Sequence, residues 1–228
     1  MGSGDEKRDK RFYAIIAAAV IILIILTVIF SSNNITSAYI DVSTLTGDEW
    51  SEDINEKYRE DKLFGLEKLR SFKYELNNNS YPAYVTVTTI KTLFMMNEKE
   101  LSDMTAKTVT EETKQLNISI NSSSKISGNR VLENHHRSSY IIYNGTDNSK
   151  SKPEKIKIFA ESWNCAQSGS SVICIGFAQV TDNAHNKSSE LLDHWATIIK
   201  DKDGTFVDLY GSQIFKDENG LFFNVICH

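Results

Sequence analysis

The stretch Trp163–Val180, WNCAQSGSSVICIGFAQV, constrains the fold more tightly than any other part of the chain. Two strand-like runs, Ile156–Cys165 and Ser171–Val180, are joined here by a turn signal. Gly169-Ser170 suits a two-residue type II′ turn, because glycine at the first central position supplies a positive φ. The residues of Val172–Val180 are apolar almost throughout, which predicts a central strand covered on both faces of its sheet.

A turn centred on Gly169-Ser170 also predicts the register of the hairpin. It pairs Cys165 with Cys174 at a non-hydrogen-bonded position, where the Cα atoms lie ~4.5 Å apart, at the near edge of disulfide geometry. The same register sets Trp163 over Gly176, so that a large ring fills the space beside a strand glycine. We therefore predict a structural disulfide between Cys165 and Cys174 in an oxidising compartment. The alternative is a pair of reduced cysteines that pack as small hydrophobes.

Upstream of the hairpin, a strand and a helix follow one another. Ala83–Leu93 is rich in β-branched residues and comes directly after Pro82, which predicts a strand. Asn97 and Glu100 have the spacing of a capping box, so a helix is expected from Asn97 to about Gln115. The remaining predicted elements are a helix over Asp48–Leu69, strands at Phe72–Leu76, Leu116–Asn121 and Ser139–Tyr143, a helix after Ser188, and a final hairpin of Phe206–Phe215 and Leu221–Cys227.

Short turns between most of these strands require antiparallel pairing. The expected fold class is therefore α+β, with a mainly antiparallel sheet that two helices cover. About 190 residues are enough for one domain with its own core and too few for two. We expect a single extracytoplasmic domain over residues 48–228, joined to the rest of the chain by a polar tether over residues 31–47.

The segment Phe12–Phe30, FYAIIAAAVIILIILTVIF, does not resemble part of a soluble domain. As a helix its nineteen residues span roughly the ~30 Å hydrocarbon core of a bilayer. The basic residues Lys7, Arg8, Lys10 and Arg11 precede it, and the next basic residue is Lys57. This asymmetry predicts a cytoplasmic N-terminus over residues 1–11, a single-pass transmembrane helix over 12–30 and an extracytoplasmic remainder. The alternative is a cleaved signal peptide, for which the run is long and the nearest cleavage site weak.

Potential glycosylation sites agree with an extracytoplasmic location. Six Asn-x-Ser/Thr sequons occur, all on the proposed outer side, where composition alone predicts about three. They lie at Asn34, Asn78, Asn117, Asn121, Asn144 and Asn186.

Composition excludes one class of partner. The chain has 25 Lys+Arg and 30 Asp+Glu among 228 residues, a net charge of −5. Nucleic-acid binding needs a clustered basic surface, which this balance does not favour. The partner that the sequence predicts is the membrane itself, through the anchor, together with another membrane or envelope protein.

Catalytic and metal-binding motifs are not evident. The adjacent pair His135-His136 cannot point the same way on a strand, and His194 lies at the edge of an apolar helix stripe. We therefore predict no metal site, no catalytic residues and no cofactor. A thiol nucleophile such as Cys174 beside His194 requires a free thiolate, which a disulfide removes. Cys227 is left over, as a free thiol or as an intermolecular link.

The segment Asp201–Gly204 resembles part of the signature of haloacid-dehalogenase-type phosphatases. In that family the signature ends an early strand, whereas here it follows a helix and few residues remain. As a calcium loop it is also incomplete, because Ser212 stands where the bidentate glutamate is needed. We interpret Asp201–Gly204 as a helix exit and turn.

The Trp163–Gly176 hairpin, followed by a Trp-bearing helix that ends in TIIKDKDG, resembles uncharacterised membrane-anchored surface proteins of methanogenic archaea. The likeness covers roughly Tyr81–Gly204. The order of strands and helices also resembles the α/β/α sandwich of PsbP-type extrinsic photosystem proteins, which implies a non-catalytic module that docks on a membrane assembly. The expected function is a membrane-anchored binding or assembly module. The alternative is a cell-surface hydrolase acting on envelope polymers, which a deep polar pocket with His135, His136 or His194 and Asp193 would favour.

Overall fold

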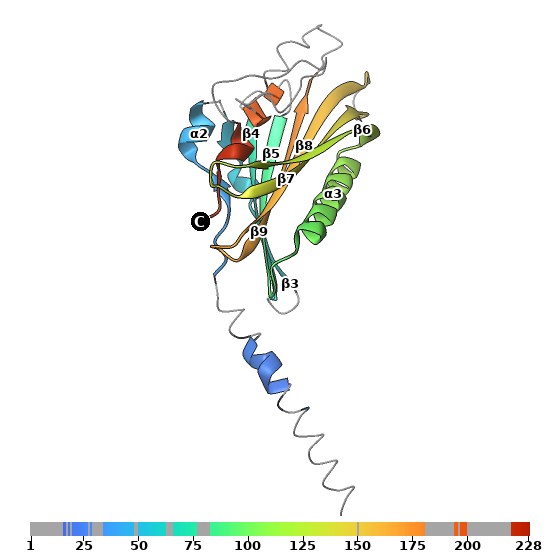
Figure 1. The fold of residues 1–228 in the computed structure, drawn as a ribbon. Coiled ribbons are helices and arrows are strands. Elements are labelled where there is room, and N and C mark those ends of the chain that lie inside the picture. The colour runs from blue at the N-terminus through green and yellow to red at the C-terminus, as the bar shows by residue number, and fades with distance from the viewer. Residues whose placement is uncertain are drawn as a thin grey trace, which may run out of the picture.

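The computed structural model describes residues 16, 18, 20–26, 28, 34–47, 50–62, 66–76, 83–149, 151–180, 194, 195, 197–199 and 220–228. Within this part of the chain, an eight-stranded antiparallel sheet has the strand order β2-β4-β5-β9-β8-β7-β6, and β3 also pairs with β4 (Figure 1). The mainly antiparallel α+β fold predicted from the sequence is confirmed at this level. The strands are β2 (Trp50–Glu52), β3 (Tyr58–Lys62), β4 (Glu67–Leu76), β5 (Ala83–Thr92), β6 (Ile118–Val131), β7 (Arg137–Asp147), β8 (Glu154–Cys165) and β9 (Ser170–Gln179).

Different elements cover the two faces of this sheet. Helix α3 (Glu98–Gln115) packs on one face, where Leu101 and Val109 join the apolar side chains of β8 and β9. The opposite face carries the larger apolar cluster, to which the short elements near both ends of the described chain contribute. These elements are β1 (Tyr39–Ile40), α2 (Val42–Gly47), the 3-10 helix η3 (Leu221–Asn224) and β10 (Val225–Ile226). The 3-10 helix η1 (Ile54–Glu56) lies outside the cluster, and its Ile54 side chain is exposed.

Strand β9 is the centre of the sheet, as the sequence predicts. It pairs with β5 on one side and with β8 on the other, and all ten of its residues are buried. The continuous apolar pattern of Val172–Ala178 follows from this position, because both faces of the strand are covered by other elements.

The register of the β8–β9 hairpin differs from the prediction. Cys165 lies opposite Ser170 and Glu161 lies opposite Cys174, so the loop is four residues long, and Gly169 has a φ of 62°. Cys165 and Cys174 are therefore four residues apart along the sheet, about 13 Å at ~3.3 Å per residue, whereas a disulfide needs Cα atoms within ~7 Å. Both cysteines are free and buried, and the predicted Cys165–Cys174 disulfide is wrong.

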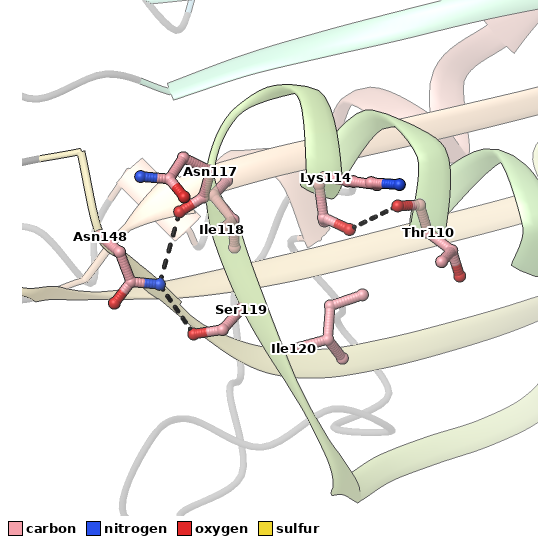
Figure 2. Close-up of a pocket in the computed structure, with 8 residues that line it drawn as sticks. Thr110, Lys114, Asn117, Ile118, Ser119, Ile120 and Asn148 are labelled. Atoms are coloured by element: carbon pink, nitrogen blue, oxygen red, sulfur yellow. Dashed lines mark hydrogen bonds between the residues drawn. The ribbon is translucent and has the colours of Figure 1, made fainter.

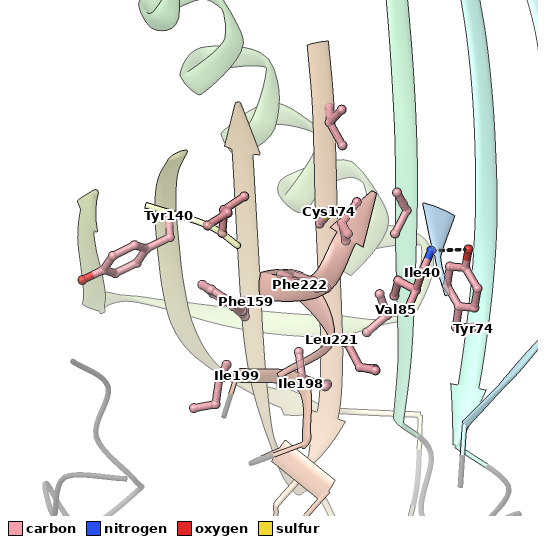
Figure 3. Packing of buried hydrophobic residues seen from close by; sticks show 14 of the residues in the cluster. Ile40, Tyr74, Val85, Tyr140, Phe159, Cys174, Ile198, Ile199, Leu221 and Phe222 are labelled. Atoms are coloured by element: carbon pink, nitrogen blue, oxygen red, sulfur yellow. Dashed lines mark hydrogen bonds between the residues drawn. The ribbon is translucent and has the colours of Figure 1, made fainter. Parts of the chain in front are cut away.

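The corrected register gives Gly176 a different neighbour. It lies opposite Phe159, not Trp163. A Cβ on Gly176 would come within 2.9 Å of Ile198 Cγ2 and 3.2 Å of Phe222 Cζ. The ring of Phe222 stacks on Phe159 with centroids 5.0 Å apart, which makes this glycine the place where η3 approaches the sheet (Figure 3).

Several local predictions are confirmed. Ala83–Thr92 is strand β5, and α3 begins with the predicted capping box, in which Asn97 Oδ1 accepts from Glu100 N at 2.9 Å. The reciprocal bond from Asn97 N to Glu100 Oε2 is 3.1 Å long. Strands at Phe72–Leu76 and Ser139–Tyr143 also form, within the longer strands β4 and β7. Of the predicted strand Leu116–Asn121, Ile118–Asn121 belongs to β6, whereas Leu116 is the C-cap of α3 and Asn117 has a φ of 57°.

The predicted helix over Asp48–Leu69 is wrong. Trp50, Ile54 and Tyr58 have near-helical spacing, but they belong to β2, η1 and β3. Trp50 is buried, whereas Ile54 and Tyr58 are exposed, so the three side chains do not share an apolar face. Strand pairing with β4 decides the conformation of this segment.

The predicted final hairpin is also corrected. Leu221–Asn224, predicted as part of a strand, is a 3-10 helix, and Val225–Ile226 pairs with Tyr39–Ile40. Phe206–Phe215 and Asp201–Gly204 lie outside the described residues. Of the predicted helix after Ser188, the described residues include Trp195, Ile198 and Ile199, which are helical and fully buried.

The apolar N-terminal segment is described in part. Its described residues between positions 16 and 28 are helical, and their large side chains are exposed. Among the described residues, no helix has both the length and the apolar character needed to cross a membrane.

A buried ion pair holds the edge of the sheet against η3. Arg130 donates from Nε to Glu161 Oε1 at 2.7 Å and from Nη2 to Glu161 Oε2 at 2.5 Å, and Ser138 Oγ donates to Oε1 at 2.5 Å. The Arg130 guanidinium also lies 5.6 Å from the ring centroids of Phe159 and Phe223. Glu161 is completely buried, so its charge depends on these partners.

Arg130→Ala is expected to lower the free energy of unfolding by about 3–5 kcal/mol, because it leaves the Glu161 carboxylate buried without its cation. Urea unfolding of the full chain in detergent measures the effect. Lys107→Ala is the control, since Lys107 and Glu111 are both well exposed and 3.7 Å apart. A loss of less than about 0.5 kcal/mol is expected there, and similar losses in the two variants would contradict the prediction.

Candidate metal centre

Four side chains with metal-ligating atoms come together at one end of the sheet. They are His136, Cys165, Cys227 and His228, and their ligand atoms all lie within 4.8 Å of one another. Both cysteines are buried, His136 is half-buried and His228 is exposed. Two sulfurs and two imidazoles at such distances form a potential tetrahedral site.

The turn between β6 and β7 positions His136. Its backbone is fixed by Leu132 N, which donates to His136 O at 3.0 Å, and by Asn134 Oδ1, which accepts from His136 N at 3.1 Å. The neighbouring His135 has a φ of 61° and its side chain is exposed. Only one of the two adjacent histidines therefore reaches the cluster, in agreement with the prediction that they point different ways.

The same turn also holds the last residues of the sequence. Asn134 Nδ2 donates to Val225 O at 3.0 Å and lies 3.8 Å from Cys227 Sγ. Glu133 N donates to Phe223 O at 3.3 Å. These bonds bring Cys227 beside Cys165, which ends β8.

The sulfurs and His228 already have separations close to those of a coordination shell. His228 Nδ1 lies 3.5 Å from Cys165 Sγ and 3.5 Å from Cys227 Sγ. Zinc–sulfur bonds of ~2.3 Å and zinc–nitrogen bonds of ~2.05 Å at the tetrahedral angle give a sulfur–nitrogen separation of about 3.6 Å. The rings of His136 and His228 meet edge to face with centroids 5.4 Å apart, and each has a nitrogen within 4.8 Å of both sulfurs.

Two buried polar atoms beside the cluster lack hydrogen-bond partners among the described residues. They are His136 Nε2 and Trp163 Nε1. A buried nitrogen without a partner is costly, and a bound cation would satisfy the imidazole nitrogen directly. The indole N–H is close enough to Cys227 to lower the pKa of that thiol, and a metal-bound thiolate would accept its hydrogen bond.

The two thiols differ in acidity. Burial raises the pKa of Cys165. Hydrogen bonds with Cys227, Ser168 and His228 have a larger opposite effect, so the pKa of Cys165 is lowered overall. Burial and the neighbouring Cys165 thiol raise the pKa of Cys227 to about 12. The two thiols therefore lose their protons in separate steps, Cys165 before Cys227, and a bound cation would favour the loss of both.

The imidazole of His136 favours the neutral form that a metal requires. Burial, followed by the charge of His228, lowers its pKa. With two sulfurs and two imidazoles in a small space, the donor set fits zinc better than a hard cation such as magnesium or calcium, which prefers oxygen.

Sequence reasoning missed this site. The prediction of no metal was based on local spacing, whereas the four residues come from a turn, a strand end and the last two positions of the sequence. The predicted disulfide partner Cys174 lies in the apolar core, where burial raises its pKa well above the usual value. The adjacent pair Cys227-His228 was a usable signal, because both residues are common metal ligands.

The other predicted residues are scattered. The sequon asparagines Asn34, Asn117 and Asn121 are exposed, and Asn144 is half-buried, whereas Asn78 and Asn186 lie outside the described residues. Of the residues expected for a hydrolase pocket, His194 is half-buried on a helix that the metal cluster does not include. The carboxylate expected beside it, Asp193, lies outside the described residues.

Asn117 occupies the exit of α3, beside a cavity of about 310 Å³ (Figure 2). Its φ of 57° places it in the left-handed region, which asparagine tolerates better than most residues. Asn148, the residue after β7, donates from Nδ2 to Ser119 Oγ at 2.9 Å. This bond joins the loop after β7 to the start of β6. Asn117 is therefore exposed at a defined helix exit, and Asn121 is exposed within β6.

Comparisons of this chain with known protein families, with curated proteins and with solved structures find no match. The resemblances to archaeal surface proteins and to the PsbP-type sandwich stay predictions.

Zinc binding is expected to release at least one proton at pH 7, because the pKa of Cys227 is raised to about 12 and a metal binds the thiolate. The affinity should therefore rise by about one logarithmic unit per pH unit between pH 6 and 8 for each displaced proton. Titration calorimetry in two buffers of different ionisation enthalpy measures the number released. Equal heats in the two buffers would contradict the prediction.

Proposed function

We propose that the chain is a membrane-anchored extracytoplasmic binding or assembly module whose domain binds one zinc ion through His136, Cys165, Cys227 and His228. The observation that carries the metal assignment is the convergence of two sulfurs and two imidazoles within 4.8 Å. The orphaned Nε2 of His136 supports it independently.

The metal would act as a clamp. It would join the β6–β7 turn, the end of β8 and the last residues, three segments that otherwise meet through hydrogen bonds and through the larger apolar cluster. The segment that it fixes carries Leu221, Phe222 and Val225, all buried in the larger apolar cluster. Binding to the folded chain alone would stabilise that cluster, by about 2.7 kcal/mol at a free zinc concentration one hundred times Kd.

The donor set favours a structural role over catalysis. Catalytic zinc sites keep one position open for water or substrate, whereas four protein ligands close the coordination shell. A non-catalytic module therefore agrees better with four convergent ligands than a hydrolase does.

The membrane anchor is supported by the exposed apolar side chains near the N-terminus. Eight large hydrophobic side chains, Ile16, Val20, Ile21, Ile22, Leu23, Ile24, Ile25 and Leu26, are 41–57% exposed. Apolar helix surface of this kind is stable in lipid and costly in water. The excess of basic residues before Phe12 supports an outer location for the domain.

One zinc ion is expected to bind per full-length chain in detergent, in competition with a chromophoric chelator. Cys165→Ser and His136→Ala should each weaken binding at least a hundredfold, because each removes a ligand atom. Trp163→Phe should weaken it about 10–100-fold, since it removes the indole N–H from which a metal-bound thiolate would accept a hydrogen bond.

Cys174→Ala is the matched control, because it removes the third buried cysteine without touching the cluster. Unchanged zinc affinity in Cys165→Ser would contradict the site. Intact-mass measurement provides a second check: a Cys165–Cys227 disulfide in the native chain, two hydrogens lighter and without metal, would replace the proposal by a covalent clamp.

The anchor predicts a sidedness. In intact cells, external protease should remove a tag placed after His228 and leave a tag before Met1 protected. Arginine substitutions at Ile22 and Ile25 should reduce retention in membranes washed at alkaline pH, because each costs about 2.5–3.5 kcal/mol at the centre of a bilayer. Ser32→Arg, beyond the apolar run, is the control. Recovery of the unmodified chain in the soluble fraction would contradict the anchor.

A further inference from the structure

The face of the sheet that carries α3 is only partly covered by that helix. Helix α3 packs against β8, β6 and β9. Beside it, β3, β4 and β5 and the end of α3 enclose an open groove of about 680 Å³. This volume is typical of sites for small organic molecules.

The floor of the groove offers an apolar surface. Leu69, Tyr84 and Leu116 line it, and the Tyr84 ring is held by stacking on Phe177 with centroids 4.9 Å apart. The serine and threonine hydroxyls of the groove bond within the protein. Ser71 Oγ and Thr88 Oγ1 are 2.9 Å apart. Thr86 Oγ1 donates to the backbone oxygen of Ile175 at 3.4 Å. These hydroxyls therefore add little to the recognition of a polar ligand.

One charged group in the groove stands out. Glu112 lies on the flank of α3 beside the buried Val109 and Thr113. Its carboxylate has no hydrogen-bond or ion-pair partner among the described residues, and its side chain is half-buried. Burial alone raises the pKa of Glu112 to about 7. A half-buried carboxylate without a partner is costly, and it commonly marks a binding site when it lies in a cleft.

The cation that lines the same groove is already engaged. Lys73 Nζ lies 2.6 Å from Glu75 Oε1 and 5.3 Å from the centroid of the Tyr84 ring. This pair is close to neutral as a unit, so Glu112 remains the uncompensated charge among the described residues of the groove.

We propose that this groove binds a small organic ammonium compound, whose apolar body lies on Leu69, Tyr84 and Leu116 and whose charged nitrogen pairs with the Glu112 carboxylate. The site is separate from the zinc cluster and does not depend on it, since no residue is shared between the two. An ammonium group would supply the missing partner of Glu112, and the ring of Tyr84 and the leucines would cover the rest of the ligand.

Phenethylamine is a suitable probe, because it combines an ammonium group with an aromatic ring. The full chain in detergent is expected to bind it saturably at pH 8, with one site per chain, and to bind the neutral 2-phenylethanol much more weakly. Glu112→Gln should weaken phenethylamine binding at least tenfold. Glu111→Gln is the matched control, because Glu111 is the preceding residue on α3, is exposed and pairs with Lys107.

The pH dependence gives a second measurement. Because Glu112 titrates at about 7, the ionised fraction falls about tenfold between pH 8 and pH 6, and the affinity for phenethylamine should fall by the same factor. The other titratable groups that line the groove are Tyr58, Lys73 and Tyr84, and tyrosine and lysine ordinarily titrate near pH 10. In Glu112→Gln the dependence between pH 6 and 8 should disappear.

Folding of the variant is checked by its unfolding midpoint. Glu112→Gln should not lower it, because the substitution removes an uncompensated half-buried charge. Absence of saturable binding at pH 8, equal affinity for the alcohol, or an equal loss in Glu111→Gln would each overturn the proposal. Binding that survives a metal chelator is expected, and binding that needs added zinc would also overturn it.

Discussion

The burial of β9 on both faces is the constraint on which the rest of the structure depends. An antiparallel strand with ten buried residues needs one layer above the sheet and another below it. Helix α3 supplies one layer, and short elements from near both ends of the described chain supply the other. Because β1, α2, η3 and β10 are too short to be stable alone, their conformation depends on the sheet that they cover.

Buried polar interactions help to hold these short elements on the side of the sheet that carries η3. The Arg130–Glu161 pair places a cation between Phe159 of the sheet and Phe223 of η3. The β6–β7 turn then holds the following residues through Asn134. The proposed zinc ion would add a third connection to this arrangement at the end of β8.

The two proposed sites differ in physical character. The cluster of His136, Cys165, Cys227 and His228 joins segments that are distant in sequence, and a metal there would act mainly on stability. The groove beside Glu112 lies where α3 leaves part of the sheet uncovered, and a ligand there would add contacts without joining separate segments. The proposed metal clamp and the proposed ligand groove agree with the proposed binding role better than with hydrolysis.

Local sequence patterns determined the features that depend on neighbouring residues, namely the capping box at Asn97, the strand from Ala83 and the central strand after Ser171. Tertiary structure alone decided the register of the β8–β9 hairpin, because a two-residue loop and a four-residue loop both suit Gly169. The observed register is the one that places Gly176 opposite Phe159, where Phe222 of η3 packs against the sheet. Pairing with β4 similarly overruled the near-helical spacing in the segment of β2, η1 and β3. The ligand atoms of the metal cluster meet only after the sheet, the β6–β7 turn and the final segment have packed together, so local spacing could point to the adjacent Cys227-His228 pair but not to the full set of four.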